Sequence, residues 1–134
     1  KGNVKTKSAE QEASKDGDDQ FLRIGFMHSG KAPSIPFFAP SWIKVIKKHM
    51  KLPSDKLTYF VAGAKHAKGQ SWESPYSDTM RLISVKGEKT KNNDEKIVVN
   101  LTKPIDAVGL WIMADGDNTQ SSFTSTLKSL SFND

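Results

Sequence analysis

Short apolar runs separated by turn residues recur along most of the chain. These runs fall at residues 21–27, 57–63, 79–85, 97–101, 106–113 and 123–132. Apolar runs of this length that end in Gly, Pro, Asn or Asp are typical of β-strands. Their regular spacing predicts an all-β fold, a sandwich or a barrel, rather than alternating helices and strands.

The stretch SWIKVIKKHMK, residues 41–51, fits two secondary structures. Its apolar residues recur at helical spacing, and Ser41 is a suitable N-cap for a short helix. A Pro-containing turn, KLPSDK, connects it to the apolar run at 57–63, and two strands joined in this way would form a hairpin-like unit. We interpret the stretch as a strand and keep the short helix as the alternative.

The first 20 residues have a different composition from the rest of the chain. Val4 is their single large apolar residue, among many Lys, Glu, Asp, Ser and Gly residues. Such a segment cannot bury enough apolar surface to offset the entropy lost on ordering it. The sequence therefore predicts a flexible polar leader over residues 1–20 and a folded domain over residues 21–134. Leaders of this kind often tether a domain, so we expect a secreted or surface-anchored protein.

Length and charge narrow the classes of protein. The 134 residues, 36% of them hydrophobic, suffice for one modest core. A net charge of +5 permits anionic partners, although the lysines are spread along the chain. The absence of cysteine excludes disulfides, thiol catalysis and Cys-ligated zinc. Apolar runs all fall short of the roughly 18 residues that a membrane-spanning helix needs, so no membrane span is expected.

The order of several segments resembles that of a known family. KLPSDKLTYFVAGA, SDTMRLISVKG, KIVVNLTKPIDAVGLWI and STLKSLSFND follow one another in the chain. This order resembles the strand sequence of galactose-binding-like jelly-roll domains, the fold of many carbohydrate-binding modules and discoidin-type adhesion domains. The resemblance covers residues 41–134 and rests on packing and turn patterns. It implies a jelly-roll β-sandwich of two antiparallel sheets, with a ligand site, often for sugars, in the loops at one rim.

The same resemblance and one loop motif are the two reasons to consider calcium binding. Some galactose-binding-like domains hold a structural calcium, but no acidic pair at the first strand here matches their ligands. Asp115 and Asp117, in the motif DGDN, have the alternate spacing of calcium loops without the closing Glu of an EF-hand. A solvated turn is the competing interpretation. The carboxylates within residues 16–19 would add ligands only if the leader docked against the domain. Apart from calcium, the sequence indicates no cofactor.

The loop at residues 64–78 holds the best candidates for a ligand site. Trp72 and Tyr76 lie in it together with His66, Gln70 and Glu73. An aromatic ring on a loop can stack on the apolar face of a sugar while amide and charged groups bond its hydroxyls. In the competing interpretation Trp72 folds back and covers one end of the sandwich.

Signals of catalysis are weak in this sequence. The three histidines are widely separated, and the chain contains no G-x-S-x-G nucleophile motif. We therefore expect a non-catalytic, exported module that binds carbohydrate or a surface glycan. One alternative is nucleic-acid binding through the lysines of residues 44–51, which would form a basic stripe on a helix. No nucleic-acid-binding motif accompanies this stripe, so we do not expect nucleic acid as the partner. A structural or adhesion domain is the other alternative.

Overall fold

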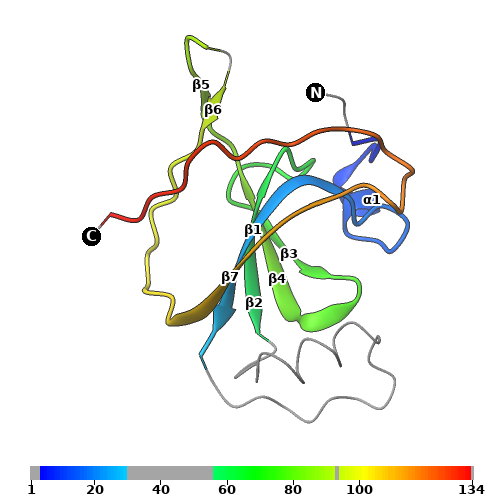
Figure 1. Ribbon diagram of the computed structural model, residues 1–134. Helices are drawn as coiled ribbons and strands as arrows, with labels where there is room; N and C mark the ends of the chain where they lie inside the picture. Colours follow the sequence, from blue (N-terminus) through cyan, green and yellow to red (C-terminus); the bar gives the residue numbers. More distant parts are fainter. Residues whose placement is uncertain (1–3, 30–55, 93, 134) are drawn as a thin grey trace.

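The computed structural model describes residues 4–29, 56–92 and 94–133 (Figure 1). One short helix, α1 (Ala9–Glu12), comes before the strands. The strands are β1 (Gln20–His28), β2 (Leu57–Ala62), β3 (Ser71–Ser74), β4 (Ser77–Val85), β5 (Glu88–Lys89), β6 (Glu95–Lys96) and β7 (Ala107–Asp115). The chain is therefore mostly β, as predicted. Residues 41–51, predicted as a strand or a short helix, lie outside the described residues.

Five strands form one twisted sheet in the order β3-β4-β2-β1-β7, and β5 and β6 form a separate two-stranded hairpin (Figure 1). The sheet is mixed, because β2 runs parallel to β4 while its other pairs are antiparallel. The prediction of purely antiparallel sheets is wrong at this pair. The reason is the connection between β2 and β4, which first makes the edge strand β3 and only then returns to lie beside β2.

Two predicted strands are not strands in the structure, and three strands were not predicted. Residues 97–101 and 124–132 form no strand, and Phe123 makes a single isolated bridge. Ile97, Val99 and Leu101 alternate as a strand requires, but Val99 and Leu101 remain 39% and 52% exposed. The unpredicted strands are β3, within residues that were expected to form a polar loop, and the two-residue strands β5 and β6. Alternation therefore marks residues suited to a strand without supplying the neighbour that completes one.

The core lies on one face of the sheet. Alternate residues of neighbouring strands meet there, because the register sets Tyr59 opposite Leu82 and Leu82 opposite Trp72. All three are buried, and Leu82 is fully so. Gly25 is required beneath the ring of Tyr59, because a Cβ atom at Gly25 would lie 2.5 Å from the ring's Cε1. Burial of these side chains supplies the main apolar stabilisation of the sheet.

Residues 4–20 differ from the flexible leader that the sequence predicts. They pack against the sheet through polar groups, and Glu12 and Asp19 are 2% and 0% exposed. The carboxylate of Glu12 accepts hydrogen bonds from the backbone N–H groups of Lys65 and His66, at 3.0 and 3.2 Å from Oε2. It also lies 2.7 Å from Nδ1 of His66. Paired polar groups hold this segment, a form of burial that apolar composition does not reveal.

No helix among the described residues is long and apolar enough to cross a membrane.

Replacing Glu12 tests how the first 20 residues are held. We expect Glu12→Ala to lower the free energy of unfolding by about 1–3 kcal/mol, because the backbone N–H groups of Lys65 and His66 lose their acceptor. Urea denaturation measures this loss, and limited proteolysis should show earlier cleavage within residues 4–20. Glu10→Ala is the matched control, because Glu10 is exposed on the same turn of α1. Equal stabilities of the two variants would contradict the proposed anchor.

Candidate functional site

Trp72 lies inside the fold rather than on a loop. It belongs to β3, is 9% exposed and stacks on the ring of His66, with centroids 3.9 Å apart and planes within 4°. Glu12 fixes His66 in turn through the contact at Nδ1. A ring buried in this way has little free surface for a sugar. The competing interpretation, in which Trp72 folds back onto the domain, describes its position.

Gln70 and Glu73 make local contacts. The side-chain Oε1 of Gln70 accepts a hydrogen bond from the backbone N–H of Ala67 at 2.8 Å, which closes the turn before β3. Glu73 is exposed on β3 and lies opposite Arg81 of β4. The five predicted ligand-binding residues are therefore not gathered into one site, although the structure does bring His66 and Trp72 together.

Tyr76 is the exposed aromatic residue of the predicted set. Its side chain is 58% exposed in the turn between β3 and β4. The hydroxyl donates to the backbone carbonyl of Lys15 at 3.2 Å and accepts from Nδ2 of Asn118 at 2.7 Å. The ammonium group of Lys15 lies 5.8 Å from the ring centroid, a cation–π contact. These contacts fix the ring at the surface beside the loop that follows β7.

That loop carries the predicted acidic motif, and residue 19 joins it. Asp115 ends β7, Asp117 follows two residues later, and Asp19 directly precedes β1. Ligand oxygens of these three carboxylates all lie within 4.8 Å of one another. The carboxylate of Asp19 accepts hydrogen bonds from the backbone N–H groups of Asn118 at 3.1 Å and Thr119 at 2.6 Å. The docking of residues 4–20 thus completes a cluster of which the DGDN motif is one half.

The acidic cluster is only partly neutralised by its neighbours. Nη2 of Arg23 lies 3.4 Å from Asp18 and 3.6 Å from Asp115, so one guanidinium serves two carboxylates. Burial raises the pKa of Asp18, and the charge of Arg23 offsets this rise only in part. Burial also raises the pKa of Asp115, where Arg23 opposes the shift and the carboxylate of Asp117 adds to it. The site therefore favours additional positive charge.

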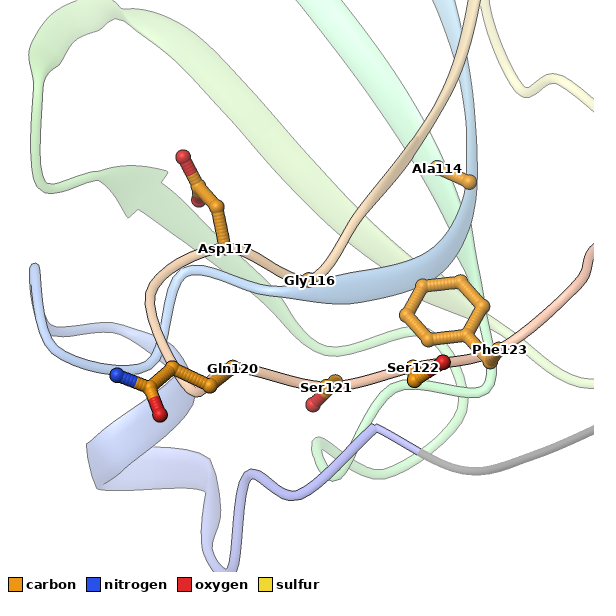
Figure 2. Close-up of a pocket in the computed structure, with 7 residues that line it drawn as sticks. All are labelled: Ala114, Gly116, Asp117, Gln120, Ser121, Ser122 and Phe123. Carbon is orange, nitrogen blue, oxygen red and sulfur yellow. The ribbon is translucent and has the colours of Figure 1, made fainter.

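An open depression of about 650 Å³ adjoins this cluster (Figure 2). It is lined by Ala114, Gly116, Asp117, Gln120, Ser121, Ser122 and Phe123. The ring of Phe123 packs closely on Gly116 and stacks on Phe21, with ring centroids 5.3 Å apart. The lining therefore combines one aromatic ring with hydroxyl, amide and carboxylate groups.

The sequence named Asp115 and Asp117 as candidate ligands, and Asp19 only on the condition that the leader docks, which was not expected. The signal for the third was the acidic run at residues 16–19, directly before the first strand. Because β1 and β7 pair antiparallel, the start of β1 lies beside the end of β7. Without this pairing the two acidic runs, about 100 residues apart, have no recognisable connection.

Comparison with known proteins gives a family without an assigned activity. The family described as "Protein of unknown function (DUF3047)" matches residues 4–131. The chain belongs to the DUF3047 family. No curated protein matches the chain, and no solved structure does. The family match includes residues 4–20, so both halves of the acidic cluster and the depression lie within the region that defines membership.

Neutralising Asp18 tests the electrostatic balance of the cluster. Because the folded pKa of Asp18 lies above its ordinary value of 3.8, its favourable contribution is complete below that pH and is lost as the pH rises through the folded pKa. Asp18→Asn removes this pH-dependent loss. Relative to the wild type, the variant should therefore gain stability as the pH rises from about 4 through the folded pKa of Asp18.

Urea denaturation across this pH range, in the presence of a chelator, measures the difference between the two proteins. A wild type that gains stability over Asp18→Asn as the pH rises would contradict the expected sign.

Proposed function

We propose that the chain is a non-catalytic module that binds carbohydrate or a surface glycan. The observation that carries the proposal is the exposed, hydrogen-bonded ring of Tyr76 beside Asn118, in the loop that lines the depression. Sugars bind to surfaces that combine a flat aromatic ring with nearby amide, hydroxyl and carboxylate groups. Glycan binding of this kind places the module outside the cytoplasm, where we propose that it acts.

The position of the site differs from that expected from the sequence. In the proposed site, Tyr76 rather than Trp72 supplies the aromatic surface. Groups of the loop after β7 take the place of His66, Gln70 and Glu73 as polar contacts. Two of these groups, Asp117 and Gln120, are exposed and point out from the lining of the depression (Figure 2). Fixing Tyr76 at its hydroxyl lowers the entropy lost when a ligand stacks on its ring.

Binding without turnover is supported by the lining of the depression. Asp117 is the one ionisable side chain among its seven lining residues. Glycoside cleavage ordinarily uses two carboxyl groups that flank the scissile bond, one as acid and one as base or nucleophile. The other two carboxylates of the acidic cluster, Asp19 and Asp115, are buried or half-buried and do not line the depression, which favours recognition over hydrolysis.

We also propose that the sheet belongs to a jelly-roll sandwich of the galactose-binding-like type. The support is the second face of the sheet, where Leu110 and Ile112 of β7 are each 47% exposed. Leu110 lies opposite Phe26 in the register, and Phe26 makes an edge contact with Phe132 at 5.9 Å. The ring of Phe132 thus contacts the face that a second layer of a sandwich would cover.

Affinity gel electrophoresis against a panel of neutral and acidic polysaccharides tests glycan binding. We expect the wild type to be retarded by at least one polysaccharide. Tyr76→Ala should weaken retention about tenfold, because a stacked aromatic ring contributes about 1 kcal/mol or more. Gln120→Ala should weaken it through a lost amide contact.

Phe132→Ala is the matched control, because Phe132 is an aromatic residue, 69% exposed, outside the proposed surface. It should leave retention unchanged. Retention of Tyr76→Ala equal to that of the wild type, or the absence of retention by every polysaccharide, would refute the proposal. Binding to nucleic acid that disappears between low and moderate salt would favour the alternative, because phosphate contacts depend steeply on salt.

A further inference from the structure

We propose that Asp19, Asp115 and Asp117 form a binding site for one calcium ion. This inference rests on the acidic cluster and is independent of glycan binding. It assigns a role to Asp19 and Asp115, two carboxylates that the proposed glycan surface does not use, since Asp19 is fully buried and Asp115 is partly so.

The separation of the carboxylates suits calcium. Calcium takes oxygen ligands at about 2.3–2.6 Å, so two oxygens on opposite sides of one ion lie about 4.6–5.2 Å apart. The oxygens of the three carboxylates lie within 4.8 Å of one another, which lets all of them reach one ion of this size. Magnesium demands a near-ideal octahedron and usually keeps several waters, with only one or two carboxylates as ligands. A site with three carboxylates therefore suits calcium better.

A second observation, the side chain of Gln20, points to the same ion. Gln20 is 1% exposed, and its Oε1 has no hydrogen-bond partner among the described residues. Its Nε2 donates to the carboxylate of Asp18 at 3.2 Å, which fixes the orientation of the amide, because an oxygen facing that carboxylate would be repelled. Gln20 lies directly opposite Asp115 in the β1–β7 register, so the two side chains leave the sheet on the same face.

The buried Oε1 of Gln20 therefore faces the side of the sheet that carries the cluster. A buried amide oxygen without a donor is unfavourable, and amide oxygens are among the ligands that calcium prefers. A bound cation would satisfy this atom as well as the three carboxylates.

The local charge also requires a cation. Asp18, Asp19, Asp115 and Asp117 are close enough to influence one another, and Arg23 is the guanidinium that faces them. Two lysines of the preceding segment are engaged elsewhere: the Nζ of Lys5 donates to the backbone carbonyl of Gln120, and the Nζ of Lys15 lies over Tyr76. A divalent ion would offset the remaining repulsion.

The site is held in place before any ion binds. The backbone N–H groups of Asn118 and Thr119 fix the carboxylate of Asp19, and β-sheet pairing fixes Asp115. Calcium would therefore link the segment before β1 to the loop after β7, and would hold Asp117 at the edge of the depression. Ligand groups arranged in advance lose little conformational entropy on binding.

Titration of the full chain with calcium tests the inference. After treatment with a chelator, the wild type should bind one calcium ion per chain by isothermal titration calorimetry. Its melting temperature should rise by about 5–10 °C at saturating calcium, and magnesium should act more weakly. Asp117→Asn should lower the calcium affinity at least tenfold. Because Asp117 is exposed, this variant should melt like the wild type in the chelator.

Two further variants separate a ligand from a fold defect. Gln20→Leu keeps the approximate shape of the side chain without its oxygen and should weaken calcium binding; its melting temperature in the chelator measures separately the loss of the hydrogen bond to Asp18. Glu88→Gln removes one exposed carboxylate from the β5–β6 hairpin and should keep the full calcium response.

The inference is overturned if about 10 mM calcium, above the weakest dissociation constants of protein calcium sites, gives neither heat nor a shift in melting temperature. It is also overturned if Asp117→Asn binds calcium like the wild type. Repeating the affinity gels in chelator keeps the two proposals distinct. Calcium binding without glycan retention would refute only the proposed function, and retention without calcium binding would refute only this site.

Discussion

The antiparallel pairing of β1 with β7 is the contact on which the rest of the structure depends. β1 lies between β2 and β7, so it connects the core-bearing half of the sheet to the edge that carries the acidic loop. The register sets Gln20 opposite Asp115. This one pairing brings residue 19 beside residues 115–119 and so assembles a site from segments that are about 100 residues apart. The depression lies at the same loop, because residues of that loop line it.

Hydrogen bonding, rather than apolar burial, determines the position of residues 4–20. Glu12 and Asp19 are buried, and each carboxylate accepts two or more hydrogen bonds from distant parts of the chain. A buried carboxylate is tolerable only where donors or cations surround it. Glu12 thus anchors this segment to the turn before β3, and Asp19 anchors it to the loop after β7. Asp19 is also a ligand of the proposed ion.

The exposed surface beside the cluster contains side chains held by hydrogen bonds and others that are free to contact a ligand. Tyr76 and Asn118 are joined by a hydrogen bond, whereas Asp117 and Gln120 project into solvent (Figure 2). An ion at the cluster would restrain the backbone of this loop without covering the ring of Tyr76. The proposed ion site and the proposed glycan site would then be neighbours on one loop, and the carboxylate of Asp117 would belong to both. The repulsion among the acidic side chains is the physical reason that this loop would bind an ion.

The sequence by itself determined where most of the sheet's strands lie, because alternation and turn residues are local signals; the runs at 21–27, 57–63, 79–85 and 106–113 became β1, β2, β4 and β7. It also identified Asp115 and Asp117 as candidate ligands. Tertiary structure alone decided that β2 and β4 are parallel, that Trp72 is buried, and that residues 4–20 dock. Each of these outcomes depends on a partner distant in sequence, and a local pattern shows what a segment can form without showing what it meets.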